Sequence, residues 1–176
     1  GAWATWVLSN HDVVRHRTRY GSEDRARAAL FLLLGLRGSP VLYAGEELGL
    51  EDAFVPPERV VDPGGRDGCR APIPWTGAPD HGWGVTDAWL PWPPDAGARN
   101  VEAQEADGGA IVHLYRRLLA ARRSAPALTL GAYESIDQPG DMIAWRRTAD
   151  PSGAHGPGDR VVVLNMGPDP AAVDLA

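Results

Sequence analysis

The stretch Trp6-Val7-Leu8-Ser9-Asn10-His11-Asp12 decides how the rest of the chain is interpreted. Its apolar start is typical of a short strand, and this strand ends on an imidazole and a carboxylate that are neighbours in the sequence. Barrel enzymes keep catalytic groups at the C-terminal ends of their strands. A carboxylate beside a hydrogen-bonding ring suits sugar chemistry, in which positive charge develops at the anomeric carbon. The alternative is a plain polar strand end, with Asn10 and Asp12 as turn residues.

The residues that follow predict a strand, a helix and a second strand. The first strand covers residues 3–9, and the polar residues 10–21 are expected to form a loop. Ser22 is a favourable N-cap for a helix that carries two acidic residues in its first turn. Apolar residues then recur at helical spacing, namely Ala26, Ala29, Leu30, Leu33 and Leu34. A short buried strand is expected over residues 40–43, and a β-α-β connection of this kind makes the two strands parallel.

Residues 51–108 show no sustained periodicity, although they hold four of the seven tryptophans. A loop of this length inside a compact domain is uncommon and is often functional. A helix is predicted next, from apolar residues at i, i+3, i+4, i+7 and i+8, namely Ile111, Leu114, Tyr115, Leu118 and Leu119. Arg122 and Arg123 suit the last turn of this helix, and Pro126 lies just beyond it.

The character of the sequence then changes from α/β to all-β. Residues 142–147 and 161–165 are predicted to be strands, and the Gly- and Pro-rich residues 150–159 between them predict a hairpin with a long loop. A domain boundary is therefore expected near residue 128.

The bulk properties exclude several kinds of partner. A length of 176 residues suggests roughly one domain. A net charge of −6 argues against nucleic-acid and anionic-membrane partners, which would need a basic patch.

Cys69 is the single cysteine, so an internal disulfide is excluded and a cytoplasmic location is expected. The longest apolar stretch, residues 28–36, is about half of what a membrane span needs. The chain starts at Gly1 on strand-like sequence and ends in an apolar run, so we interpret it as a piece of a longer protein.

Three further segments agree with the opening one. Val13-Val14-Arg15 follows Asp12 directly, Tyr43-Ala44-Gly45-Glu46-Glu47-Leu48-Gly49-Leu50 follows the second strand, and Arg66-Asp67-Gly68-Cys69-Arg70-Ala71-Pro72 lies in the long loop. In this order, the four segments resemble glycoside hydrolase family 13, the α-amylase superfamily, and more closely its α-glucosidase and oligo-1,6-glucosidase members. The resemblance covers nearly the whole chain.

The resemblance implies an α/β fold, namely the C-terminal part of a (β/α)8 barrel followed by the start of an all-β sandwich. Residues 1–128 would be the last two βα units of the catalytic barrel, with a long loop after its eighth strand. Residues 129–176 would begin the sandwich domain.

The resemblance also implies roles for three residues. Asp12 matches the family's third catalytic carboxylate, which binds the sugar in the cleavage subsite and stabilises the transition state. A fixed anion near an oxocarbenium-like centre binds more tightly as positive charge develops. His11 matches the histidine that hydrogen-bonds the same sugar, and Arg15 matches an arginine of the α-glucosidase branch that holds a carboxylate or donates to sugar hydroxyls. The alternatives are a structural cap for Asp12, a packed histidine for His11 and a surface or structural arginine for Arg15.

Other residues with chemical potential are given structural roles. Glu46 and Glu47 are not interpreted as an acid/base pair, because the matching family segment is mainly architectural. Arg66 and Asp67 are expected to shape the loop near the site entrance, and their contact with substrate stays open. Cys69 is expected to be a small buried residue rather than a nucleophile. Four tryptophans of the loop could stack on sugar rings or simply hold the loop in place: Trp75, Trp83, Trp89 and Trp92.

The leading functional prediction is a hydrolase that cleaves terminal α-1,4 or α-1,6 glucosidic bonds of oligosaccharides or disaccharides with retention. A retaining glycosidase needs a carboxylate nucleophile and a carboxylic acid about 5 Å apart. In the family these lie on barrel strands four and five, and no acid of this chain lies in a matching motif. We therefore expect the isolated chain to be inactive.

Two alternatives stay open. One is glucosyl transfer of the trehalose synthase or sucrose isomerase type, and the other is a non-catalytic relative that serves as a partner subunit. No cofactor is predicted. Some family members bind calcium, but no oxygen-ligand loop of EF-hand type occurs here.

Overall fold

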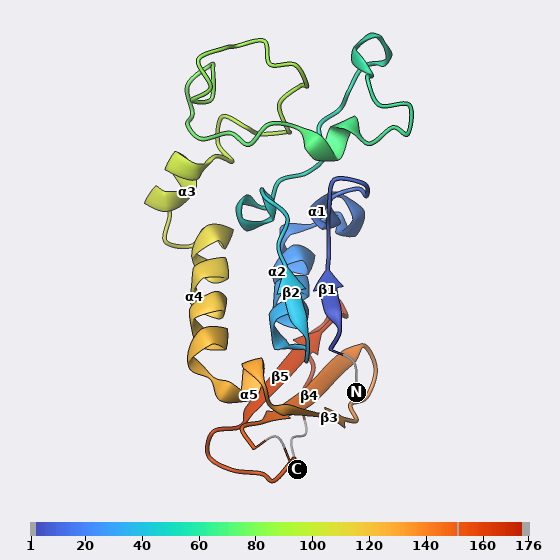
Figure 1. The fold of residues 1–176 in the computed structure, drawn as a ribbon, viewed down its shortest axis with the longest axis vertical. Helices are drawn as coiled ribbons and strands as arrows, with labels where there is room; N and C mark the ends of the chain where they lie inside the picture. Colours follow the sequence, from blue (N-terminus) through green and yellow to red (C-terminus); the bar gives the residue numbers. More distant parts are fainter. Residues whose placement is uncertain (1–2, 151, 174–176) are drawn as a thin grey trace. The chain divides into compact units, whose positions relative to one another are not determined.

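The computed structural model describes residues 3–150 and 152–173 of the chain (Figure 1). Gly1 and Ala176, on which the expectation of a longer protein rests, lie outside the described residues. The strands are β1 (Thr5–Val7), β2 (Ser39–Val41), β3 (Ala132–Ile136), β4 (Met142–Thr148) and β5 (Arg160–Asn165). The α-helices are α1 (His16–Tyr20), α2 (Glu23–Gly35), α3 (Val101–Ala106), α4 (Ile111–Ser124) and α5 (Pro126–Thr129), and the 3-10 helices are η1 (Glu46–Leu48), η2 (Pro57–Arg59) and η3 (Asp67–Arg70).

The chain divides into two compact units, each discontinuous in sequence. The first unit comprises Gly1–Trp6, Arg27–Val41 and Arg116–Ala176, and the second comprises Val7–Ala26 and Leu42–Tyr115. The expected boundary near residue 128 would separate a barrel domain from a sandwich domain. That division differs from these two units, and it stays a prediction.

A two-stranded sheet of β1 and β2 belongs mainly to the first unit. The two strands lie side by side and run in the same direction, as the predicted β-α-β connection requires (Figure 1). The indole Nε1 of Trp6 donates to the carbonyl of Arg37 at 2.9 Å and fastens the entry to β2. The expectation of a buried second strand is wrong, because β2 is largely exposed in a described sheet of only two strands.

Helix α2 follows the predicted pattern closely. The five apolar residues at helical spacing are all buried, and the Ser22 hydroxyl accepts the backbone N–H of Arg25 as an N-cap. Its C-terminal end is stabilised from elsewhere in the first unit. The buried Arg122 donates to the carbonyls of Leu34, Leu36 and Gly38.

A three-stranded antiparallel sheet, ordered β3-β4-β5, completes the first unit. The pairing of β4 with β5 confirms the predicted hairpin, and its loop includes residue 151, which lies outside the described residues. Strand β3 was not predicted, because Glu134 and Ser135 interrupt its apolar pattern. Trp145 of β4 is fully buried, and its indole donates to the carbonyl of Gly35 at the end of α2.

The second unit carries most of the irregular structure. The expectation of a loop over residues 10–21 is wrong in part, because the short helix α1 forms there and ends at Gly21, whose φ of 72° is left-handed. Short helices also interrupt the long loop, and the Asn100 side chain caps α3 by accepting the backbone N–H of Ala103. A small apolar core packs the segment after β2 against the start of α4. Its buried residues are Leu48, Leu50, Ala110 and Val112, and Ile73 and Val101 pack against them.

Candidate functional site

A tight turn after β1 presents the two residues predicted to face the sugar. The Asn10 side chain accepts the backbone N–H of Asp12 at 2.8 Å, and Asn10 forms a β-bridge with Val13. The turn leaves the His11 and Asp12 side chains 68% and 49% exposed, with His11 Nε2 3.3 Å from Asp12 Oδ2. This geometry places an imidazole and a carboxylate together at an accessible tip, where both can hydrogen-bond a ligand.

The Asp12 carboxylate is also held by two arginines of the long loop. Its Oδ1 accepts from Arg66 Nη1 at 2.8 Å and from Arg70 Nη2 at 3.3 Å. Arg70 Nε donates in addition to the carbonyl of His11 at 2.8 Å. Two guanidinium groups therefore fix the orientation of this carboxylate and of the turn that carries it.

Asp62 completes the network from the far side of Arg66. Its carboxylate accepts the Arg66 backbone N–H at 2.9 Å and Nε at 2.8 Å, and Arg70 Nη1 lies 3.6 Å away. These hydrogen bonds from Arg66 hold the pKa of Asp62 well below its usual range, and Asp62 in turn raises the pKa of Arg66. Two carboxylates and two guanidiniums, those of Asp12, Asp62, Arg66 and Arg70, thus form one alternating cluster of charges.

Arg15 lies in a different environment from the other two predicted site residues. Only 2% of Arg15 is exposed. Its Nη1 donates to the carbonyl of Ala44 at 2.8 Å, and the guanidinium lies 4.7 Å from the centroid of the Tyr43 ring. Its backbone N–H donates to Asp52, and burial lowers the pKa of Arg15 although Tyr43 and Asp52 oppose that effect. Arg15 therefore joins the start of α1 to the segment that follows β2.

The loop around Arg66 is shaped by buried groups. Asp67 Oδ2 accepts the backbone N–H groups of Val61 and Asp62, as expected for a residue that shapes the loop. Cys69 is buried, its thiol contacts the Arg66 carbonyl, and burial raises the pKa of this thiol. These facts confirm Cys69 as a small buried residue, because a nucleophile needs an accessible thiolate.

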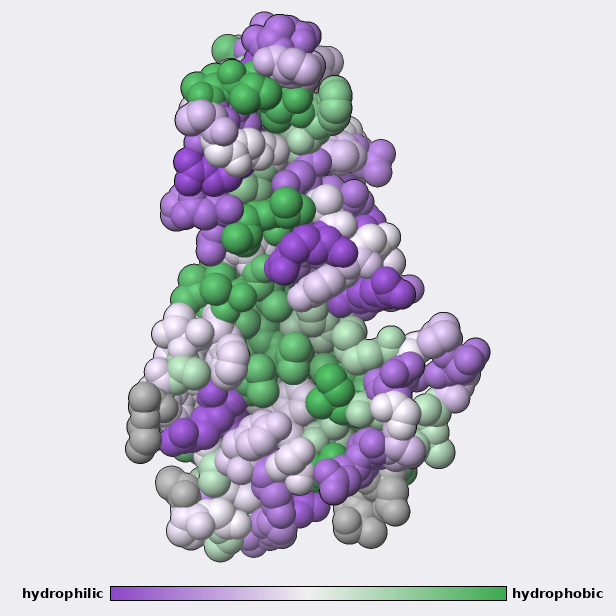
Figure 2. Space-filling model, turned by 90° about the vertical axis from the view of Figure 1, so that its right-hand side faces the viewer, coloured by the Kyte–Doolittle hydropathy of each residue, from purple (hydrophilic) through white to green (hydrophobic). Residues whose placement is uncertain are grey.

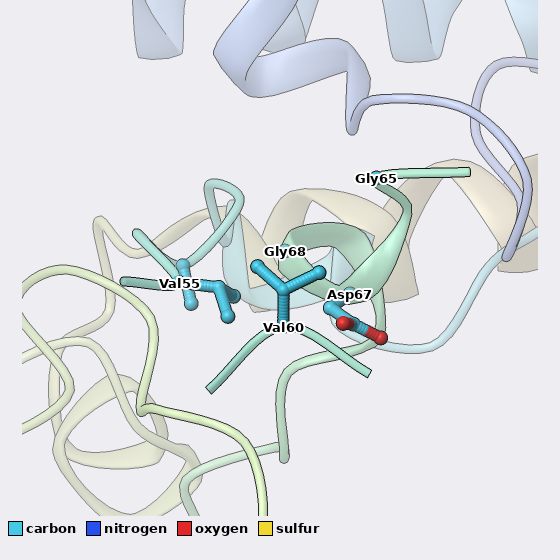
Figure 3. A pocket seen from close by; sticks show the side chains of 6 residues that line it. Val55, Val60, Gly65, Asp67 and Gly68 are labelled. Atoms are coloured by element: carbon cyan, nitrogen blue, oxygen red, sulfur yellow. The ribbon is translucent and has the colours of Figure 1, made fainter. Parts of the chain in front are cut away.

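A cavity of about 260 Å³ lies within this loop (Figure 3). Its lining is mostly apolar or glycine: Ala53, Val55, Val60, Gly65, Asp67 and Gly68. The one lining carboxylate, Asp67, already accepts two backbone N–H groups through Oδ2. Asp12 and His11 do not line this cavity.

The two neighbouring glutamates of η1 do not form an exposed acid/base pair. Glu46 is 1% exposed and its Oε1 lies 3.5 Å from His16 Nδ1, while Glu47 accepts the backbone N–H of Gly45. Burial, with added repulsion from Glu46 and Glu47, raises the pKa of Tyr115 far above its usual value. These contacts agree with an architectural role for the segment.

Three of the four tryptophans of the loop expose flat rings. Trp75, Trp83 and Trp89 are about half exposed or more, whereas Trp92 packs edge-on against His81 at 4.5 Å. The Trp83 indole donates to the carbonyl of Ile73 at 2.7 Å, so this ring is held in place by the loop backbone. Sugar stacking by these rings stays a prediction.

In the part of the chain that the structure describes, no three His, Cys, Asp or Glu side chains gather as they would to hold a metal ion. Among the same residues, no helix combines the length and apolar character needed to cross a membrane.

Comparison with known proteins identifies the family. The protein-family model described as "Alpha amylase, catalytic domain" matches residues 1–131 of this chain. A probable alpha-glucosidase of Rhizobium meliloti (strain 1021) is 36% identical over 187 residues, which cover 98% of this chain and 33% of that protein. The chain belongs to the α-amylase family, glycoside hydrolase family 13, and lies in its catalytic domain over most of its length.

Solved structures agree with this assignment. An alpha-glucosyl transfer enzyme, XgtA, matches with a TM-score of 0.78 and 40% identity, over 85% of this chain and 30% of that chain. The trehalulose synthase MutB matches with a TM-score of 0.79 and 25% identity, over 93% of this chain and 35% of that chain. The chain spans about a third of the length of the curated relatives that it matches.

The sequence did not assign two residues of the charge cluster. Arg70 lies in the same family-like segment as Arg66, so its place in that segment was the available signal. Asp62 lies in no recognisable motif, and only the folded loop brings its carboxylate to Arg66.

Proposed function

We propose that the native protein that carries this chain is a retaining α-glucosidase acting on terminal α-1,4 or α-1,6 glucosidic bonds of oligosaccharides or disaccharides. In this proposal the chain supplies Asp12 as the carboxylate that stabilises the transition state, with His11 and Arg15 as substrate-site residues. The nucleophile and the acid/base belong to other parts of the native protein, so the chain is inactive by itself.

The observation that carries the proposal is the fixed and accessible carboxylate of Asp12. Its Oδ1 is held by Arg66 and Arg70, and its Oδ2 faces His11. An anion that is already oriented needs no reorganisation when positive charge develops on a sugar ring, and it therefore binds the transition state better than the ground state. Family membership over residues 1–131 supports the same reaction class.

The same proposal covers the fold and location of the native protein. Strands β1 and β2 would be the seventh and eighth strands of a (β/α)8 barrel, and β3, β4 and β5 would open a β-sandwich after a boundary near residue 128. The expected cytoplasmic location rests on the single cysteine, Cys69.

The buried position of Arg15 favours one version of its role. Its guanidinium donates to Ala44 and lies against Tyr43, so its influence on a sugar would pass through the segment after β2. In this version Arg15 is a substrate-site residue that orders the segment after β2.

Replacing Asp12 tests the function. In the native protein, Asp12→Asn should lower kcat/KM for an α-glucoside by at least about a hundredfold, since about 3 kcal/mol of transition-state stabilisation is lost. Asp87→Asn is the matched control, because Asp87 is an exposed carboxylate that also pairs with an arginine, Arg59. Steady-state kinetics of both variants test the role of Asp12, and Asp87→Asn should keep kcat/KM near the wild-type value. Near-normal turnover of Asp12→Asn would contradict the proposed function.

Glucosyl transfer is the second candidate, and the likeness to XgtA and MutB favours it. Product analysis separates the two functions, because hydrolysis releases glucose whereas transfer or isomerisation gives a new disaccharide. A native protein with neither product, and with no upstream Asp and Glu to serve as nucleophile and acid, would instead be the non-catalytic partner subunit.

A further inference from the structure

The turn that carries Asp12 is closed at its base by a buried serine and a buried histidine. Ser9 immediately precedes Asn10, and His16 begins α1. The backbone N–H of His16 donates to Ser9 Oγ at 2.8 Å, and the same oxygen lies 3.0 Å from His16 Nδ1. Two contacts from one hydroxyl therefore tie the first residue of the segment 9–16 to its last.

This closure is itself fastened to the segment after β2. His16 Nδ1 lies 3.5 Å from Glu46 Oε1, and both side chains are 1% exposed. A buried carboxylate is costly unless a hydrogen-bond donor or a positive charge lies against it. His16 Nδ1 faces two groups that can accept a proton, Ser9 Oγ at 3.0 Å and Glu46 Oε1 at 3.5 Å, and the carboxylate oxygens of Glu46 have no hydrogen-bond partner among the described residues.

Among the groups packed around Glu46, the His16 ring is the one that comes within 3.5 Å of its carboxylate. Tyr115 of α4 and Arg15 interact electrostatically with Glu46, but the Arg15 guanidinium donates to Ala44 instead. The His16 ring also lies 5.8 Å from the Tyr20 ring of the same helix. The imidazole is thus enclosed, and its orientation is set by Ser9 and Glu46.

We propose that Ser9 and His16, fastened to Glu46, are positioning residues that hold the Asp12 turn in its working conformation. We call these three side chains the Ser9–His16–Glu46 clasp. The inference rests on the proposed function, because it assigns the clasp to the reaction that Asp12 serves. The clasp touches no substrate, and it acts by closing the segment 9–16, on whose tip His11 and Asp12 lie.

A displaced carboxylate stabilises the transition state poorly, since shifts of about 1 Å can cost up to about a hundredfold in rate. In the native protein, Ser9→Ala and His16→Leu should therefore lower kcat about tenfold while KM changes less than about threefold. His16→Gln keeps a side-chain amide that can donate toward Ser9 and Glu46, and it should recover part of the lost kcat. Ser22→Ala is the matched control, because it removes a hydroxyl that likewise accepts one backbone N–H, that of Arg25, away from the turn.

Hydrogen exchange measured by mass spectrometry gives a readout that does not depend on activity. Ser9→Ala should speed exchange over residues 10–16 about tenfold and leave α4 unchanged, whereas Ser22→Ala should leave residues 10–16 protected. The inference is overturned if Ser9→Ala speeds exchange throughout the protein. It is also overturned if Ser9→Ala and His16→Leu lower kcat no more than Ser22→Ala does.

The two proposals fail in different ways. If Asp12→Asn abolishes turnover while Ser9→Ala and His16→Leu turn over normally, the clasp has no positioning role and the proposed function stands. If the wild-type native protein has no action on α-glucosides, the proposed function fails. Selective exchange over residues 10–16 in Ser9→Ala then still supports the clasp, and unchanged exchange overturns it.

Discussion

At the residue scale, the Asp12 carboxylate depends on arginines that lie 54 and 58 positions further along the chain. Arg66 is the central residue of this arrangement, because its guanidinium bridges two carboxylates. Its Nη1 donates to Asp12, and its Nε and Nη2 donate to Asp62. A planar fork with several fixed donors can do this, whereas an ammonium group cannot match the geometry.

Replacing this fork by a point charge should weaken the site without removing the charge. Arg66→Lys in the native protein is expected to lower kcat/KM about tenfold, since oriented ionic hydrogen bonds are lost at a partly exposed site. The conservative change Arg59→Lys, at an arginine paired with the exposed Asp87, is the control. Equal kinetics for the two variants would show that the fork of Arg66 plays no part.

The lowered pKa of Asp62 predicts a pH dependence with a definite sign. The hydrogen bonds from Arg66 favour the folded carboxylate, so their stabilisation is present above the unfolded pKa of about 3.9 and is lost as the pH falls through the lower folded pKa. Asp62→Asn should therefore lower Tm by a constant amount between about pH 5 and 8, and the difference should shrink below about pH 4. A difference that stays unchanged down to about pH 2 would contradict this account.

At the element scale, the C-terminal end of α2 shows how separate segments of the first unit are joined. A helix leaves its last carbonyl groups without partners, and these need donors from elsewhere. Arg122 of α4 and Arg147 of β4 supply them, and Arg147 also donates to the carbonyl of Gly131. Burial, with repulsion from Arg122 and Arg37, lowers the pKa of Arg147 to about 10.

Gly35 permits this junction because it has no side chain. A Cβ at Gly35 would lie 2.8 Å from Cζ2 of Trp145 and 2.9 Å from Cγ2 of Val162. Gly35→Ala should therefore cost about 1–3 kcal/mol of unfolding free energy through overpacking, despite the better helix propensity of alanine. Denaturant unfolding of the native protein measures this, with Gly97→Ala as control, since a Cβ there meets open space. A stabilised Gly35→Ala variant would refute the packing argument.

At the scale of the whole molecule, the sheet of β1 and β2 leaves large apolar groups exposed, including Trp6, Val7 and Val41. Apolar side chains also reach the surface on the face drawn in Figure 2. An open strand edge beside such groups favours association between chains.

The chain expressed alone is therefore expected to aggregate or to unfold without a sharp transition, and to lack glucosidase activity. Light scattering and calorimetry test for aggregation and for a sharp unfolding transition, and an α-glucoside assay tests for activity. A monomer with a sharp two-state thermal transition would contradict the expected instability of the isolated chain.

Local sequence pattern was sufficient to predict several elements of the fold. The buried face of α2, its Ser22 cap, the helix over residues 111–124 and the hairpin of β4 and β5 all follow from periodicity, capping and turn residues. The family also followed from the sequence, because short segments such as Asn10-His11-Asp12 occur in the right order.

The tertiary structure decided what depends on contacts between distant segments. The pairing of Asp12 with Arg66, the burial of Arg15 and the contact of His16 with Glu46 have no local signature, because each joins residues on different loops or helices. The helix α1 was missed because its five residues are too few to show a period, and buried contacts at His16 stabilise it. The strand β3 was missed because Glu134 and Ser135 interrupt its apolar pattern, and antiparallel pairing with β4 stabilises it. Local pattern thus accounts for α2, α4 and the β4–β5 hairpin, while contacts between distant segments set where the site residues lie.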